Sequence, residues 1–202
     1  MTHIGHSEKV FLMRAFIAAL VLIFSLQSWT KADDVKDFSI YGISLGESLL
    51  EYYSKDEIYE NVDPNVYKNK DGKFKLTGFY GKFGEYDGLQ FAIKPNDKNL
   101  IIYGINGGIF FSNIDECNIK RKSIRKELSL LFKGAITNFD DKNIHPVDST
   151  GKSYLISDSF FLKSGSASVK CFNWSDEITE KYEWSDNLRV GVKLKEYNDW
   201  LD

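Results

Sequence analysis

Alternating apolar and polar positions mark strands along the chain. From Leu188 to Lys195 every second residue is apolar, which predicts a strand with one buried face. Five other segments show similar alternation or short apolar runs between turn residues. The six predicted strands span residues 73–80, 88–94, 100–111, 153–162, 166–174 and 188–195.

A helical period replaces this alternation between Asn113 and Lys133. Asn113 is a good N-cap, Glu116 follows three residues later, and Gly134 comes directly after the segment. Apolar residues share one side of this predicted helix: Ile114, Cys117, Ile124, Leu128, Leu131 and Phe132. A short strand at 38–41 and a shorter helix from about Glu47 are also predicted, whereas residues 61–70 and 135–152 are polar and predict connections.

The order of these elements predicts the fold class. A helix and three strands are followed by a second helix and three strands, and consecutive strands joined by turns favour antiparallel pairing. We expect residues 33–202 to form a single α+β domain, with an antiparallel sheet of about six strands and helices on one face. A tandem repeat of the helix-plus-three-strands unit is one interpretation, although the two halves share no convincing residue identity.

Residues 1–32 have the three parts of a secretory signal peptide. Lys9 and Arg14 precede an apolar run that ends at Leu26, and Thr30 to Ala32 form a small-x-small cleavage site. The run is shorter than the ~20 residues of a membrane span, and an uncleaved anchor is the alternative. Translation from Met1 or from Met13 fits this pattern. We expect a periplasmic or secreted protein that meets the membrane through its signal peptide before cleavage.

Composition narrows the classes of partner. The 202 residues include 26 Lys and Arg against 29 Asp and Glu, and the formal net charge is −3. A slightly acidic chain is a poor candidate for nucleic-acid binding. Aromatic residues make up 15% of the sequence, which argues against intrinsic disorder.

The two cysteines predict a disulfide bond. Cys117 lies on the apolar side of the predicted helix, and Cys171 lies in the predicted strand 166–174. A helix packed on the sheet brings such residues together. An oxidising compartment favours a Cys117–Cys171 bond over the alternative of two buried thiols.

Two groups of residues are candidates for contact with a partner. A basic run on the predicted helix includes Arg121, Lys122 and Arg125, which indicates either a docking site for an anionic partner or a solvated helix face. Arg121 falls within the apolar stripe, so we expect it to reach the rim or to pair with a carboxylate. Aromatic residues at element ends, Trp174 and Trp184 among them, indicate either interface anchors or caps on the core.

The sequence singles out no catalytic or metal-binding constellation. Asp140, Asp141, His145 and Asp148 share one polar segment, but their spacing matches no EF-hand pattern, and no Gly-x-Ser-x-Gly elbow accompanies His145. The segment Gly104–Gly108 lacks the Lys-Ser/Thr of a phosphate loop and falls in a predicted strand, where glycine more often marks a bulge or bend. We therefore expect no metal or cofactor.

A resemblance to known proteins supports export. Its residues are Leu26–Asp34, Phe38, Ile40, Gly42–Leu50, Glu116–Cys117, Ile124, Leu128, Val169, Cys171, Trp174 and Trp200–Leu201. Together they resemble small exported proteins of pelagic, Pelagibacter-like alphaproteobacteria, which implies a bacterial periplasmic location and no particular activity. The turn Gly42–Ser48 is also similar to the start of tandem α+β modules such as β-lactamase-inhibitor-like domains and the small lipoprotein of the outer-membrane assembly machine, although the lipoprotein cysteine is missing.

These observations favour an exported, non-enzymatic binding or interaction module whose partner is a protein, a peptide or a glycan. The alternatives are a periplasmic hydrolase that uses carboxylates and a secreted inhibitor-like protein. Two acids about 5–9 Å apart in a deep pocket would favour the hydrolase. An exposed apolar groove without convergent titratable residues would favour the binding module.

Overall fold

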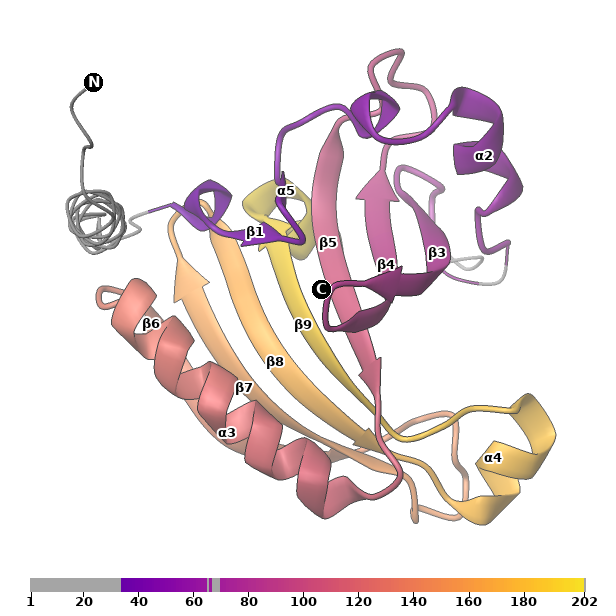
Figure 1. Ribbon diagram of the computed structural model, residues 1–202, viewed down its shortest axis with the longest axis vertical. Helices are drawn as coiled ribbons and strands as arrows, with labels where there is room; N and C mark the ends of the chain where they lie inside the picture. Colours follow the sequence, from indigo (N-terminus) through magenta and orange to yellow (C-terminus); the bar gives the residue numbers. More distant parts are fainter. Residues whose placement is uncertain (1–33, 65, 67–69, 202) are drawn as a thin grey trace, which may run out of the picture. The chain divides into compact units, whose positions relative to one another are not determined.

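The protein is seen here as a computed structural model that describes residues 34–64, 66 and 70–201 (Figure 1). The predicted signal peptide, residues 1–32, lies outside the described residues. Within the described part, seven strands form an antiparallel sheet in the order β3-β4-β5-β9-β8-β7-β6. The predicted α+β class and antiparallel sheet are confirmed, and the sheet has seven strands in place of about six.

Two meanders of three strands flank a central strand that comes last in the sequence. The strands are β3 (Lys75–Phe83), β4 (Tyr86–Ile93), β5 (Ile102–Phe110), β6 (Ile136–Ile144), β7 (Tyr154–Leu162), β8 (Gly165–Asn173) and β9 (Asn187–Leu194). Strand β9 pairs with β5 on one side and with β8 on the other, so it joins the meander β3-β4-β5 to the meander β6-β7-β8.

Strand β6 corrects the prediction that residues 135–152 form a polar connection. Residues Ile136–Ile144 pair with β7 along one edge of the sheet. Nearly every side chain of β6 is exposed, so its sequence lacks the alternation that marks a half-buried strand. A register shift between Asn138 and Asp141 interrupts the pairing.

Short elements precede the sheet. They are η1 (Val35–Asp37), β1 (Ser39–Ile40), β2 (Ile43–Ser44), η2 (Leu49–Glu51) and α2 (Lys55–Glu60). Strands β1 and β2 form a tight hairpin, because Tyr41 and Gly42 both have positive φ, as a two-residue turn requires. The helix predicted from Glu47 is divided into η2 and α2 at Ser54, whose side chain makes a capping box with Glu57.

Helix α3 (Ile114–Leu131) packs against β8 and forms as predicted. The side chain of Asn113 accepts a hydrogen bond from the Glu116 N–H at 2.9 Å, which caps the first turn. Cys117 in this helix and Cys171 in β8 form a disulfide bond, with their Cα atoms 6.0 Å apart. The predicted pairing of Cys117 with Cys171 is thus present.

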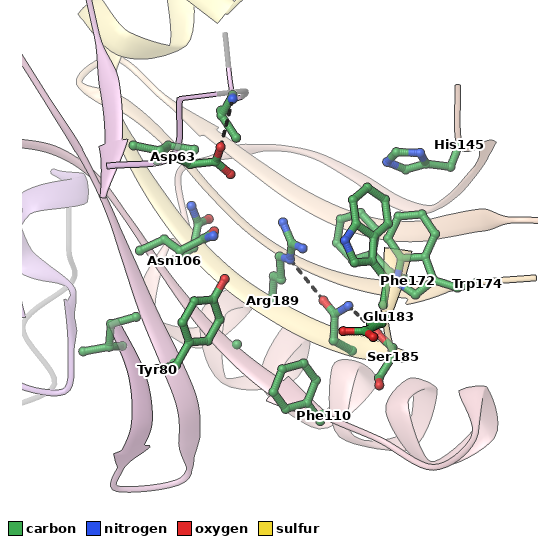
Figure 2. A pocket seen from close by; sticks show the side chains of 18 residues that line it. Asp63, Tyr80, Asn106, Phe110, His145, Phe172, Trp174, Glu183, Ser185 and Arg189 are labelled. Atoms are coloured by element: carbon green, nitrogen blue, oxygen red, sulfur yellow. Dashed lines mark hydrogen bonds between the residues drawn. The ribbon is translucent and has the colours of Figure 1, made fainter. Parts of the chain in front are cut away.

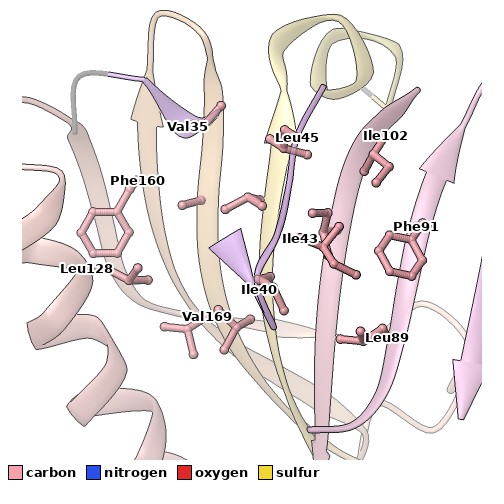
Figure 3. Packing of buried hydrophobic residues seen from close by; sticks show 14 of the residues in the cluster. Val35, Ile40, Ile43, Leu45, Leu89, Phe91, Ile102, Leu128, Phe160 and Val169 are labelled. Carbon is pink, nitrogen blue, oxygen red and sulfur yellow. The ribbon is translucent and has the colours of Figure 1, made fainter. Parts of the chain in front are cut away.

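The main core lies between the sheet and the elements on its α3 side. Leu128 of α3 faces Phe160 of β7 and Val169 of β8, while Ile40 and Ile43 of the hairpin cover the next strands (Figure 3). All five side chains are at most 3% exposed. Burial of this apolar surface supplies the main driving force for folding.

The opposite side of the sheet carries helix α5 (Lys195–Leu201) at one end. Tyr197 of α5 packs with Phe74 and Ala92 in a second cluster. A Cβ atom added at Gly104 would lie 2.7 Å from the Tyr197 ring, so this glycine lets α5 rest closely on β5. Helices therefore contact both faces of the sheet, which differs from the expectation of helices on one face.

Helix α4 (Asp176–Tyr182) follows β8 and was not predicted. Its Ile178 joins Phe172 and Trp174 in a third apolar cluster. In the described ranges, no helix is long and apolar enough to cross a membrane.

Candidate binding site

The side of the sheet opposite α3, which we call the open face, is uncovered between α5 and α4. Strand register sorts its side chains into rows that cross the sheet, and neighbouring rows are about 6–7 Å apart along the strands. Three rows matter here, and each row has its own chemistry.

The aromatic row lies nearest α4 and consists of Leu155, Phe172, Asn187 and Phe110. The cationic row comes next and consists of Asp141, Ser157, Lys170, Arg189, Gly108, Gly88 and Tyr80. The amide row lies on the α5 side and consists of Asn138, Ser159, Ser168, Gly191, Asn106, Gln90 and Gly78.

A cavity of about 480 Å³ opens on the open face. Its volume is within the range of sites for small molecules, roughly 300–1,000 Å³. Figure 2 shows the Arg189 side chain at its centre, with Asn106 and Tyr80 on one side and Phe172 and Trp174 on the other.

One side of the cavity is a continuous aromatic wall, which consists of Phe172, Trp174, Trp184 and Tyr182. Phe172 and Trp174 stack with ring centroids 5.6 Å apart, and Trp174 meets Trp184 at 4.8 Å. Trp184 in turn stacks on Tyr182 at 5.0 Å. Of these four, Phe172, Trp174 and Trp184 line the cavity. Stacked rings provide a large apolar surface with few rotatable bonds, which suits a binding wall.

The guanidinium of Arg189 packs against the first ring of the aromatic wall: it lies 4.7 Å from the centre of the Phe172 ring. The Nε of Arg189 also donates a hydrogen bond to Asn187 Oδ1 at 3.0 Å. These two contacts fix the plane of the guanidinium on the cavity floor.

Lys170 stands directly opposite Arg189 on the neighbouring strand. Burial, and then the positive charge of Arg189, lower the pKa of Lys170 from its usual 10.5, while Asp141 raises it less. Like charges placed directly opposite each other destabilise a sheet. The pair therefore imposes an unfavourable interaction on the fold.

The segment around His145 closes one end of the cavity. The His145 ring meets the Trp174 ring edge-on at 4.6 Å. Burial, and then the charge of Arg189, lower the pKa of His145 from its usual 6.5, so this histidine is neutral at pH 7.

Asp148 fastens this segment to the start of α4. Its carboxylate accepts hydrogen bonds from the hydroxyls of Thr150, Ser153 and Ser175 at 2.6–2.9 Å. The Ser153 and Thr150 hydroxyls hold the pKa of Asp148 well below its usual 3.8. The cluster thus stays charged at neutral pH and acts as a structural clamp behind the aromatic wall.

A second clamp holds the segment between β8 and β9. Asp186 accepts a hydrogen bond from the Trp174 N–H at 2.8 Å, and its own carbonyl accepts one from the Phe111 N–H at 2.9 Å. Within the described residues, the buried Nε1 of Trp174 has no hydrogen-bond partner.

Two acidic residues, Asp63 and Glu183, also line the cavity. In Figure 2 they lie on opposite sides of the Arg189 side chain. Among the described residues, no group of three or more His, Cys, Asp or Glu side chains could hold a metal ion.

The candidate interaction residues fall on two different faces. Trp174 and Trp184 line the cavity, whereas Arg121, Lys122 and Arg125 belong to α3 on the other side of the sheet. No observation tests whether these five residues contact a partner, so their interaction role stays a prediction.

Arg121 and Arg125 are engaged within the chain. Arg121 is 1% exposed and forms an ion pair with the fully buried Asp158. Asp140 lies 2.7 Å from both arginines, and its pKa is lowered by Arg121 and then by Arg125. Lys122 is exposed.

Lys170, Arg189, Asn106 and Phe172 were missed by sequence reasoning as site residues. Each lies at a polar or terminal position of a predicted strand, and this position is the only sequence signal that could have marked it as a site residue. Alternation predicts that the side chains of such residues point away from the core. It does not predict which strands pair with each other or in which register.

In comparisons with known proteins, no family model, no curated protein and no solved structure matches the chain.

Proposed function

We propose that the protein is an exported, non-enzymatic binding module whose ligand site is the cavity on the open face. The observation that supports this most is the continuous aromatic wall beside a polar floor. Mostly apolar cavities with a few placed polar groups are typical of small-molecule sites. A protein, peptide or glycan partner, as suggested by the sequence, would have to insert into the cavity a small group that is mostly apolar and has a few polar atoms.

A fluorescent probe tests the proposal directly. Phenylnaphthylamine is uncharged, aromatic and fluorescent in apolar surroundings. We expect the protein, expressed as the full chain and recovered from the periplasm, to bind it saturably at one site. Absence of saturable binding would contradict the proposed site.

Gly108→Val is a blocking variant for the same titration. A Cβ atom added at Gly108 would meet one atom within 4 Å, the Gly88 carbonyl oxygen at 3.9 Å. The backbone therefore accepts a side chain, which fills the cavity floor. We expect this variant to fold and to lose the probe; retained binding would place the probe elsewhere.

Export and architecture belong to the same proposal. The signal-like pattern of residues 1–32 supports export, and N-terminal sequencing of secreted protein should return a chain that begins at Asp33. An intact N-terminus on exported protein would favour the uncleaved anchor. A repeat would need a different second unit from the predicted one: the meander after α3 is β6-β7-β8, and the predicted third strand, 188–195, is β9, which joins the two meanders.

A further inference from the structure

Glycine residues make the cavity floor low enough for neighbouring side chains to lie on it. A Cβ atom at Gly88 would lie 3.3 Å from the Tyr80 ring, and one at Gly191 would overlap the amide oxygen of Asn106. Above Gly108 the floor is open, because only the Gly88 carbonyl oxygen lies within 4 Å of a Cβ atom placed there. Glycine inside a strand often marks a place where a ligand approaches the backbone closely.

Three polar side chains on the cavity lining are available to an occupant, those of Gln90, Asn106 and Glu183. Within the described part of the chain, none of these three side chains has a hydrogen-bond or ion-pair partner. Each amide can both donate and accept hydrogen bonds, whereas a carboxylate accepts them. A matching occupant therefore carries groups that donate and groups that accept.

Charges of both signs line the cavity, so neither an anion nor a cation is favoured as its occupant. The carboxylates of Asp63 and Glu183 lie on opposite sides of Arg189 (Figure 2). An anion would meet these two carboxylates, and a cation would meet the guanidinium. Because like charges at an interface repel, a neutral occupant fits this lining better than either ion.

Exposed aromatic rings supply the apolar part of the lining. Tyr80 is 77% exposed, Phe110 is 55% exposed and Trp184 is 39% exposed. Rings of this kind pack against flat apolar surfaces. The lining residues come from five neighbouring strands, β3, β4, β5, β9 and β8, which together span roughly 19 Å across the sheet. The cavity therefore suits an extended occupant that presents several apolar faces.

We infer that the occupant of the cavity is a neutral carbohydrate, a short oligosaccharide. The C–H faces of its sugar rings pack against Tyr80 and Phe110, and its hydroxyls bond to Gln90, Asn106 and Glu183. Each sugar hydroxyl can donate one hydrogen bond and accept two, so it matches amides and a carboxylate alike. This inference rests on the proposed function, because it assigns a ligand class to the same cavity.

Calorimetric titration with three neutral oligosaccharides tests the ligand class. The probes are cellotetraose, maltotetraose and tetra-N-acetylchitotetraose, added to the full chain recovered from the periplasm. We expect at least one of them to bind at a single site. Failure of all three to bind would overturn the inference, and so would binding of choline in their place, which would assign the cavity to an organic cation.

Asn106→Leu separates the sugar from an apolar ligand. It removes the amide and keeps a side chain of similar size, so we expect it to weaken the bound oligosaccharide about tenfold. Phenylnaphthylamine should keep its affinity within about twofold, which also reports that the variant is folded. Tyr80→Ala, at a largely exposed ring, should weaken the oligosaccharide about tenfold as well, and it decides the matter if Asn106→Leu does not fold.

Asn138→Leu is the matched control, since Asn138 belongs to the same amide row but is exposed on β6 and does not line the cavity. It should leave the oligosaccharide affinity unchanged. The inference is overturned if Asn106→Leu binds the sugar as the parent does, or if Asn138→Leu weakens it equally. In each of these cases the proposed function stands as long as Gly108→Val abolishes binding of phenylnaphthylamine, and it fails if that dye does not bind saturably to the parent protein.

Discussion

Asp158 neutralises a charge inside the protein. It is fully buried in β7, and it pairs with Arg121 of α3, which is 1% exposed. Its Oδ1 also accepts a hydrogen bond from the Asp140 N–H at 2.8 Å, where Asp140 has a positive φ of 55°. The same carboxylate therefore holds both the buried arginine and the irregular edge of the sheet.

We expect Asp158→Ala to lower the free energy of unfolding by about 3–5 kcal/mol, because Arg121 is left as a buried charge without its main partner. Urea denaturation measures the loss. Asp140→Ala is the matched control: its side chain is 55% exposed and Arg121 keeps Asp158, so the loss should stay below about 1 kcal/mol. Equal losses in the two variants would contradict this account.

Lys170 should affect stability in the opposite direction. We expect Lys170→Met to raise the free energy of unfolding by up to about 1 kcal/mol at pH 7, because the charge opposite Arg189 disappears. The folded protein releases the Lys170 proton below 10.5, the pKa of the unfolded chain, so the parent protein regains stability as pH rises toward 10.5. The difference between variant and parent should therefore shrink over that range. A loss of stability at pH 7 would indicate that Lys170 is held for structure instead.

At the scale of elements, the disulfide ties the first turns of α3 to the last part of β8. Cys117 and Cys171 are 54 residues apart in sequence, and both are fully buried. The bond therefore constrains a long stretch of chain that includes β6 and β7.

We expect the double variant Cys117→Ala, Cys171→Ala to lose about 4 kcal/mol of stability, from the loop-closure entropy of the unfolded chain. Chemical denaturation of the variant beside the non-reduced parent measures this loss. Ellman titration of the unfolded, non-reduced parent is the control and should find no thiol. Two reactive thiols, or equal stability, would contradict the bond.

Helix α3 and most strands of the sheet follow from sequence because their periodicity is strong. Asn113 caps α3 as its side chain predicts, and the alternation of β9 puts Val190 and Val192 in the core. Local patterns of this kind are imposed by burial on one side of the element.

Strand β6 and the binding site could not be predicted in the same way. An edge strand that buries almost nothing leaves no apolar period, so Ile136–Ile144 resembles a polar connection. The neighbourhood of Lys170 and Arg189 arises from the pairing of β8 with β9, which depends on the whole topology. Residues that are unremarkable in sequence thus come together through register.

For the whole molecule, the two sides of the sheet have different roles. The α3 side contains the main core and the disulfide, whereas the open face holds the cavity, the cation pair and the unpaired Trp174 Nε1 within the described residues. Features that weaken the fold gather on the side that we propose to bind ligand. This is the expected trade-off between stability and function.

Ligand binding should accordingly stabilise the protein. At a free concentration about 100 times its Kd, phenylnaphthylamine should add about 2.7 kcal/mol, which raises the melting temperature by about 5–10 °C for a domain of this size. Circular dichroism at fixed protein concentration records the shift. Gly108→Val should melt at the same temperature with and without the dye, and a shift in that variant would place the effect outside the cavity.

The position of β9 has a consequence for the order in which the protein is made. Its eight residues lie near the end of the chain, yet they form the seam between the two meanders. During synthesis each meander can pair its own strands as it emerges, because their contacts are close in sequence. The two halves acquire a common sheet only when Asn187–Leu194 inserts between β5 and β8.

Until then β5 and β8 are exposed sheet edges, which can pair with strands of other chains. A nascent protein of this topology would therefore benefit from a chaperone that covers these two edges until β9 is made.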